Sequence, residues 1–179
     1  MSKSQKNSEK YSLALRLLHW TGVPVMLVVY ASIFLRKLYE RGTEPFKLMS
    51  TVHVGFGALL MVWLFFRLAA YSFSNKPPIA PEVPAWQKSA LKLMLGIQWG
   101  LMVVLPLSGW LMGNAKGRVV NVFGMPLPSL IEKNDTFAKA LTEGHIAMAY
   151  VLLVLIVLHT SMALWHHFFK KDNAIRRML

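Results

Sequence analysis

All six histidines in this 179-residue chain fall in long apolar stretches of the sequence, with His166 and His167 at the end of the last one. The other four are His19, His53, His145 and His159. Ionisable side chains inside a membrane-spanning segment are costly, and by default they mark a functional site. Because imidazole is a good ligand for haem iron, zinc and copper, these four side chains predict a buried metal or haem site.

The spacing of His145 and His159 predicts that both lie on one side of a helix. They are 14 residues apart, which at about 100° per residue is about 40° short of four full turns. With a rise of about 1.5 Å per residue, they lie about 21 Å apart along the helix axis. One of the two would therefore lie near each surface of a membrane.

The elements that must position these histidines are four apolar stretches, each long enough to cross a bilayer as a helix of about 20 residues. They cover residues 13–35, 49–71, 90–112 and 144–168. The composition agrees, because 55% of the residues are hydrophobic and 16% are charged, whereas soluble domains have about 25% charged residues. We expect an all-α membrane protein with a single domain, residues 1–179, formed by a four-transmembrane-helix bundle. Its one sizeable extramembrane segment is the loop 113–143.

The net charge of +12 divides unequally between the two faces of the predicted bundle. The N-terminal segment, the second connection and the C-terminal tail together hold 12 basic and three acidic residues. The first and third connections hold eight basic and five acidic residues, a net charge of +3. The positive-inside rule predicts that both termini are cytoplasmic in a multi-pass protein of the cytoplasmic membrane. Topology thus accounts for most of the basic charge, and nucleic acid is not expected as a partner.

Depth in the membrane sorts the four histidines into two facing pairs. His53 lies a few residues into the second span, which starts outside, and matches the depth of His145. His19 lies early in the first span, which starts inside, and matches the depth of His159. Each pair could hold one flat iron porphyrin through both axial positions, and the absence of cysteine leaves non-covalent b-type haem. Zinc or copper is the alternative, although a two-histidine site is incomplete for structural zinc.

Other side chains have candidate roles around the two haems. Glycines near the histidines would leave room for the macrocycles, unless they serve helix packing instead: Gly22, Gly55, Gly57 and Gly144. Arg16 and Arg67 lie at the depth of the inner haem, and their guanidinium groups suit the haem propionates. Both could instead be flanking residues that follow the positive-inside rule.

Candidate substrate contacts lie near the two surfaces of the bundle. His166 continues the face of His159 about 10 Å nearer the cytoplasm, so His166 and its neighbour Trp165 are candidate contacts for a quinone. On the outer face, the net positive charge would concentrate an anionic substrate. Lys116 and Arg118 are the candidate steering residues there, with binding of lipid headgroups as the alternative.

Several segments resemble the bacterial cytochrome b561 family, which is related to the cytochrome b subunits of nickel–iron hydrogenases. They are Arg16-Leu-Leu-His-Trp20, Val52-His-Val-Gly55 with Arg67-Leu68, Leu105-Pro-Leu-Ser-Gly109, Gly144-His145, and a tail from Leu158 to Asn173 that closes with Arg176-Arg-Met178. The resemblance implies a bundle enclosing two b-type haems in the bacterial inner membrane, with axial ligands carried over onto the same four histidines. The third helix departs from the family pattern at two positions, since Lys92 and Leu95 occupy the place of a histidine pair that the family often has there.

The resemblance also implies an activity. Similar proteins look like superoxide oxidases, which take an electron from superoxide at the periplasmic face and pass it to ubiquinone. We expect transmembrane electron transfer of this kind, with membrane lipid, quinone and superoxide or another small donor as partners and no obligate protein partner. Two alternatives remain: a cytochrome b subunit fed by a hydrogenase or another dehydrogenase, and a haem-free four-helix transporter or structural protein.

Overall fold

The computed structural model describes residues 10–74, 77, 84–171 and 175–179. Its elements in chain order are α2 (Leu13–Arg36), α3 (Glu44–Phe73), α4 (Ala85–Ala115), β1 (Asn121–Val122), β2 (Met125–Pro126), α5 (Asp135–Trp165) and the π-helical turn η1 (His166–Lys170). Part of the basic set assigned to the cytoplasmic face, namely Lys3, Lys6 and Lys76, lies outside the described residues. In the part of the chain that is described, four helices are long and apolar enough to cross a membrane, which confirms the predicted fold class.

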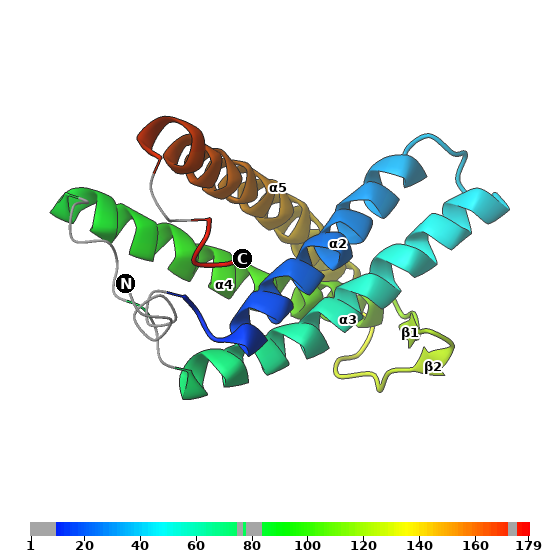
Figure 1. Ribbon diagram of the computed structural model, residues 1–179. Coiled ribbons are helices and arrows are strands. Elements are labelled where there is room, and N and C mark those ends of the chain that lie inside the picture. The colour runs from blue at the N-terminus through cyan, green and yellow to red at the C-terminus, as the bar shows by residue number, and fades with distance from the viewer. Residues whose placement is uncertain (1–9, 75–76, 78–83, 172–174) are drawn as a thin grey trace.

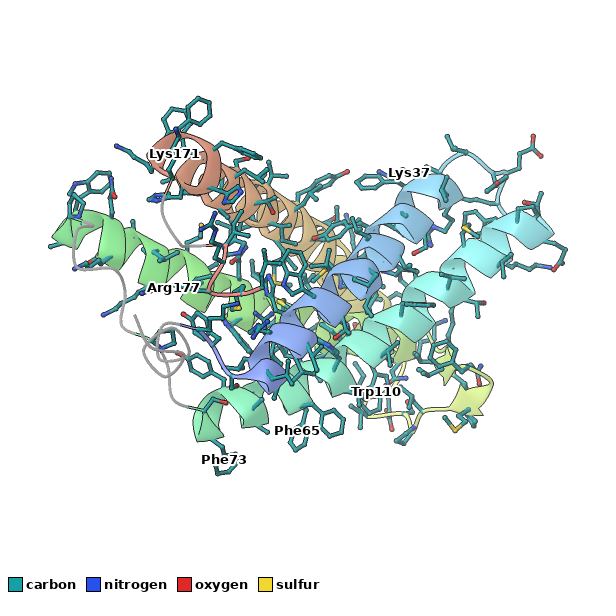
Figure 2. All side chains as sticks on the ribbon, viewed as in Figure 1. Lys37, Phe65, Phe73, Trp110, Lys171 and Arg177 are labelled. Atoms are coloured by element: carbon teal, nitrogen blue, oxygen red, sulfur yellow. The ribbon has the colours of Figure 1, made fainter. Side chains whose placement is uncertain are left out.

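Few side chains of these helices are buried within the protein itself. Large apolar residues such as Leu27, Phe65 and Val154 are exposed, and Figure 2 shows Phe65 and Phe73 pointing away from the bundle. Such exposure would be unfavourable in water, since apolar surface is stabilised by removal from it. Surrounding lipid accounts for it, because a helix that satisfies its own backbone hydrogen bonds can present apolar side chains to hydrocarbon.

The four helices associate as two antiparallel pairs. Helix α2 packs closely along α3, and α4 packs along α5, whereas the contact between α3 and α4 is less extensive. No close backbone approach occurs between α2 and α5 within their described lengths. Figure 1 shows the two pairs inclined to each other, so that they diverge from the middle of the molecule. Side chains from α2 and α5 must therefore span the distance between the pairs, and the histidines do so.

The ends of the helices follow local capping signals. Ser12 begins α2, because its Oγ accepts a hydrogen bond from Leu15 N, and Asn134 begins α5, because its Oδ1 accepts one from Phe137 N. The helices extend beyond the apolar spans into the predicted extramembrane segment 113–143, since α4 continues to Ala115 and α5 already starts at Asp135. The hydropathy pattern located the apolar part of each helix but not its polar continuation beyond the hydrocarbon.

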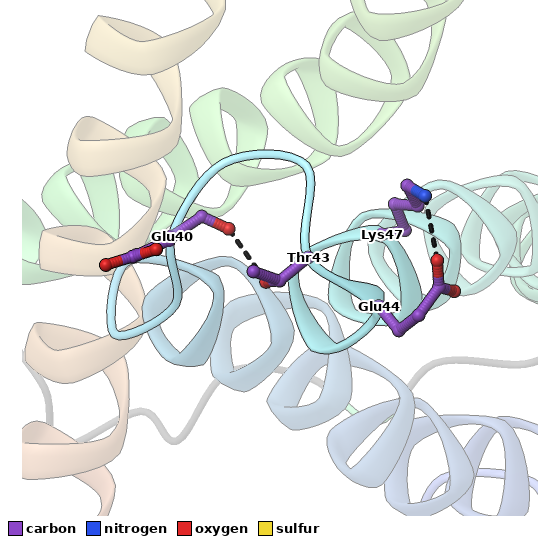
Figure 3. A network of polar contacts seen from close by, with 4 residues as sticks. All are labelled: Glu40, Thr43, Glu44 and Lys47. Atoms are coloured by element: carbon purple, nitrogen blue, oxygen red, sulfur yellow. Dashed lines mark hydrogen bonds and ion pairs between the residues drawn. The ribbon is translucent and has the colours of Figure 1, made fainter.

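The turn between α2 and α3 is closed by short-range polar contacts (Figure 3). Thr43 Oγ1 donates to the carbonyl oxygen of Glu40 at 2.8 Å, and Lys47 Nζ forms an ion pair with Glu44 Oε1 at 2.8 Å. Both partners of that ion pair are largely exposed, so its contribution to stability is small. Gly42 adopts a left-handed conformation with φ of +93°, which glycine tolerates without steric cost.

A two-stranded hairpin, which the sequence pattern did not predict, lies in the loop between α4 and α5 (Figure 1). Strands β1 and β2 pair antiparallel through a turn in which Phe123 and Gly124 both have positive φ, the requirement of a type I′ turn. The Phe123 ring packs against Phe56 at a centroid distance of 6.2 Å. A Cβ atom on Gly55 would lie only 2.9 Å from the Phe123 ring, so Gly55 is where the hairpin docks on α3.

Both described ends of the chain meet at one end of the bundle. Tyr11 N donates to the carbonyl oxygen of Arg177 at 3.1 Å, and Trp20 Nε1 donates to that of Met178 at 2.7 Å. The tail 175–179 therefore lies along the first turns of α2. This end corresponds to the face that the charge distribution predicts to be cytoplasmic, and the hairpin lies towards the other.

Candidate functional site

Two pairs of histidines bridge the helix pairs, and they are the pairs predicted from depth. The ring centroids of His53 on α3 and His145 on α5 are 6.4 Å apart, and those of His19 on α2 and His159 on α5 are also 6.4 Å apart. We call these the outer pair and the inner pair. Because their α5 members are 14 residues apart, the pairs lie about 21 Å apart along that helix.

Hydrogen bonds orient both rings of the outer pair. His53 Nδ1 lies 2.9 Å from the carbonyl oxygen of Val29, which can only accept, so Nδ1 carries the proton. His145 Nδ1 lies 2.9 Å from Ser108 Oγ, whose own hydroxyl donates to the Leu105 carbonyl. Ser108 therefore accepts from His145, and Nδ1 again carries the proton. Both Nε2 atoms are left with a free lone pair, as ligation of a metal requires.

The inner pair has a different hydrogen-bond arrangement. Arg67 Nη2 lies 3.0 Å from His19 Nδ1. Because guanidinium can only donate, His19 Nδ1 accepts and the proton of the neutral ring lies on Nε2. Nε2 of His19 can then bind a metal only after Arg67 turns away and the tautomer changes. Hydrogen bonding thus prepares the outer pair for a ligand role, and holds His19 in the opposite tautomer.

The distance within each pair fits one metal ion between two imidazoles. A metal–nitrogen bond of about 2.0 Å and about 1.1 Å from nitrogen to ring centroid, taken twice, give about 6.2 Å between centroids, against the observed 6.4 Å. No cluster of three or more histidine, cysteine or acidic residues occurs in the described ranges. Each pair thus offers two protein ligands, the number that a haem needs, and fewer than the three or four of zinc sites.

Two of the four glycines near the histidines leave open space, as a flat group such as a porphyrin would need. Gly57, one turn from His53 on the same face, and Gly144 have no heavy atom within 4 Å of an added Cβ. Gly22 is instead filled by Trp63 and Gly55 by Phe123. The expectation of open space at Gly22 and Gly55 was wrong, because large aromatic side chains from elsewhere in the chain pack there.

Arg67 lies at the inner pair, and Arg16 lies one turn before His19 on α2. The Arg67 guanidinium lies over the rings of Trp63 and Trp99, 5.3 Å and 5.0 Å from their centroids, in addition to its contact with His19. Arg16 Nε is buried and has no hydrogen-bond partner among the described residues. Neither arginine has a carboxylate partner in that part of the chain. A buried cation without a counter-charge is costly, so an acidic group such as a propionate fits both positions.

A group of three cations lies at the outer pair. The neighbouring charges of Arg118 and Arg36, together with burial as the larger cause, lower the pKa of Lys116. Lys116 also acts electrostatically on His145, and Arg36 acts on His53. Lys116 thus lies within electrostatic range of Arg118 and of Arg36, which sequence reasoning treated only as one charge of the first connection.

The predicted quinone contacts, Trp165 and His166, lie where α5 passes into the π-helical turn η1. Trp165 stacks on Phe169, with centroids 4.2 Å apart, and is half exposed. His166 begins the π-helical turn η1. Lys92, at the departure from the family pattern, is exposed on α4, and Leu95 is half-buried there.

Ser108 is the functional residue that sequence reasoning missed. The signal was available in the segment Leu105-Pro-Leu-Ser-Gly109, where a serine lies inside an apolar helix. Ser108 is buried, and its hydroxyl links the Leu105 carbonyl to His145. Its role could not be assigned from the sequence because His145 is 37 residues away on another helix.

Comparison with known proteins agrees with the resemblance in the sequence. The family model described as prokaryotic cytochrome b561 matches residues 10–179. "Cytochrome b561 homolog 1" of Escherichia coli K12 is 29% identical over 162 residues, covering 90% of this chain and 92% of that protein. The "Probable superoxide oxidase CybB" of Yersinia pestis is 26% identical over 171 residues, covering 96% of each. The chain is therefore an electron-transfer membrane protein that belongs to the prokaryotic cytochrome b561 family.

Proposed function

We propose that this chain is a transmembrane cytochrome b with two b-type haems, one held by His53 and His145 and the other by His19 and His159. The observation that carries the proposal is the 6.4 Å centroid distance in both pairs, which suits one iron between each two imidazoles. The haem supplies a one-electron carrier at each position. The family to which the chain belongs supports haem b as the cofactor.

The protein's own residues orient the outer imidazoles and supply positive charge at the inner pair. Ser108 and the Val29 carbonyl fix the outer imidazoles with Nε2 free. Arg67 and Arg16 would neutralise acidic substituents at the inner pair. Trp63 donates from Nε1 to Thr21 Oγ1 at 3.1 Å and fills the space above Gly22, which ties α2 to α3 beside the inner site.

The reaction that we propose is the oxidation of superoxide at the outer face and the reduction of ubiquinone at the inner face. Two superoxide anions would each lose one electron and leave as dioxygen. One quinone would take up both electrons and two cytoplasmic protons and leave as quinol. The cation group of Arg36, Lys116 and Arg118 supports an anionic substrate at the outer face, since a positive mouth raises its arrival rate.

The proposal also includes the orientation of the chain in the membrane and the residues that contact the quinone. Both termini would face the cytoplasm of a bacterium, so that the loop with the hairpin lies in the periplasm. His166 and Trp165 are proposed as quinone contacts from their place at the inner end of α5. The name of the Yersinia pestis relative supports superoxide as the donor.

The test is anaerobic reduction of the purified protein by a panel of donors: superoxide, quinol and ascorbate. We expect two haems per chain by pyridine haemochrome assay, and superoxide-dependent reduction of a ubiquinone analogue. Haem reduction by quinol but not by superoxide, together with co-purification of a large dehydrogenase, would instead identify a cytochrome b subunit. Absence of a Soret band would leave the haem-free alternative.

A further inference from the structure

Helices α2 and α5 carry the two histidines of the inner pair, but their backbones make no close approach within the described lengths. His19 on α2 and His159 on α5 nevertheless have ring centroids only 6.4 Å apart. One link between the two helices is Tyr30, which donates to the Ala149 carbonyl at 2.8 Å. Ala149 is ten residues before His159, or about 15 Å along α5, so this link does not act at the depth of the inner pair.

The tail 175–179 follows α5 in the chain and lies at the inner end of α2. Lys171 ends the turn η1 in a left-handed conformation with φ of +53°, and a left-handed residue at the end of a helix turns the chain away from the helix axis. Met178 N donates to the Ile175 carbonyl at 2.8 Å, so the tail contains a tight turn of its own. Figure 1 shows the tail, in red, between the end of α5 and the first turns of α2.

Two hydrogen bonds hold the tail against α2. The carbonyl oxygen of Arg177 accepts from Tyr11 N at 3.1 Å, and that of Met178 accepts from Trp20 Nε1 at 2.7 Å. Both acceptors are main-chain atoms of adjacent residues. A tryptophan N–H next to apolar surface usually has a hydrogen-bond partner, and the tail supplies it here.

Trp20 links the tail to the inner pair. Its ring lies edge-on to the ring of His19, with centroids 5.4 Å apart and planes crossing at 82°. The indole is attached to α2 at one end and held by Met178 at the other, so its plane is fixed and limits the rotation of the His19 ring. The outer pair obtains its orientation differently, from acceptors at both Nδ1 atoms.

We propose that the tail 175–179 is a positioning segment for the inner histidine pair. It holds the first turns of α2 at the end of α5, and it fixes Trp20 against His19. Because main-chain carbonyls make the contacts, the presence and path of the tail matter more than its side chains. The effect on a haem rests on the proposed function, whereas the effect on α2 does not.

The first experiment measures the effect on α2 without reference to haem. The chain is ended at residue 174, reconstituted in nanodiscs and compared with the unmodified chain by amide hydrogen exchange. We expect faster exchange in residues 12–20 and unchanged exchange in residues 135–145, at the far end of α5. Equal exchange of residues 12–20 in the two chains would overturn the inference, whatever haem either chain holds.

The second experiment measures the effect on the inner haem by competition with apomyoglobin. Trp20→Phe keeps an aromatic ring beside His19 but loses the donor to Met178. The inner haem should bind about fivefold more weakly in this variant, as expected for one lost hydrogen bond, and at least about tenfold more weakly in the chain ended at residue 174. The outer haem should bind as before in both, which also shows that both variants are folded.

Spectroscopy distinguishes positioning of His19 from a general loss of stability. In Trp20→Phe the low-spin ferric resonance of the inner haem should move, because the imidazole plane is free to turn, while that of the outer haem stays constant. Met178→Ala, which keeps the carbonyl, and Trp86→Phe, at an exposed tryptophan on α4, should match the unmodified chain. An equal change at both haems in Trp20→Phe, or an unchanged inner haem in the shortened chain, would overturn the inference. A chain without haem in which shortening still speeds exchange of residues 12–20 would contradict the proposed function and support the contact of the tail with α2.

Discussion

The outer and inner histidine pairs have the same separation but different surroundings. At the outer pair, a main-chain carbonyl and a serine hydroxyl accept from both Nδ1 atoms, and neither group carries a charge. At the inner pair, a half-buried arginine that lies over two indole rings donates to His19. Neutral acceptors fix a tautomer permanently, whereas an arginine can exchange one acceptor for another. The outer site is therefore preorganised, whereas the inner site depends on a cation that must find an anionic partner.

The largest expected effect is the loss of one haem from one pair at a time. His53→Ala or His145→Ala should lower the haem content from two to one per chain and remove the outer haem. His19→Ala or His159→Ala should remove the inner haem. Pyridine haemochrome assay and redox difference spectra measure this, with His167→Ala as the control that keeps both haems. Loss of both haems from every variant would mean that the two sites are not independent.

The next effect concerns the orientation of the outer pair by Ser108. Ser108→Ala removes the acceptor of His145 Nδ1–H, and loss of such a partner typically weakens a metal site by about 10–100-fold. The outer haem should bind more weakly, and its potential should rise because the imidazole becomes a poorer electron donor. Competition with apomyoglobin and a potentiometric titration measure the two effects. Ser108→Thr keeps the hydroxyl and should behave as the unmodified protein. An equal change at both haems in Ser108→Ala would contradict an action of Ser108 on the outer pair alone.

Replacing Arg67 should shift the reduction potential of the inner haem in the opposite direction, downwards. Arg67→Gln removes a cation that favours the reduced state of the inner haem, so the inner potential should fall while the outer potential stays constant. A loss of about 1.4 kcal/mol in Coulomb interaction corresponds to about 60 mV for a one-electron couple. Arg67→Lys, which keeps the charge, should shift the potential less. An unchanged inner potential in Arg67→Gln would show that Arg67 does not neutralise a haem substituent.

The smallest effect is expected at the outer cations. Replacing both Lys116 and Arg118 with glutamine should slow superoxide-dependent quinone reduction several-fold and weaken its dependence on salt. Lys47→Gln is the control, since Lys47 is paired with Glu44. Stopped-flow rates that do not change with ionic strength in the unmodified protein would contradict a steering role.

Lys116 also predicts a dependence on pH. Its pKa is lowered by burial and by the charges of Arg118 and Arg36. A lysine is charged below its pKa, so Lys116 loses its charge at a lower pH than an exposed lysine does. The steering effect should therefore weaken as the pH rises through this lowered pKa. Lys116→Arg keeps the charge and should extend the fast rate to higher pH, which stopped-flow measurements across alkaline pH can test.

The sequence predicted the helices and histidine pairs because both depend on regular spacing. The length of each apolar segment predicts a membrane-spanning helix, and the 14-residue spacing of His145 and His159 places both on one face of a helix. Ser108, Arg36 and the Val29 carbonyl could not be predicted, because their roles depend on which helices pack together. The hairpin was missed because a Phe-Gly turn is an unusual type I′ sequence, and Phe123 is held there by α3. The space beside Gly22 and Gly55 could not be predicted for the same reason, because it depends on which side chains of other segments pack against these glycines.

The most direct test of the central claim is low-temperature electron paramagnetic resonance of the oxidised, purified protein. The imidazole planes cross at 77° in the outer pair and 64° in the inner pair. Two low-spin ferric signals with one large g value each are expected, because steeply crossed imidazole planes leave the iron d orbitals nearly degenerate. His53→Ala should remove one signal and His19→Ala the other. A high-spin signal from either site in the unmodified protein, or a single low-spin centre, would contradict ligation by two histidine pairs.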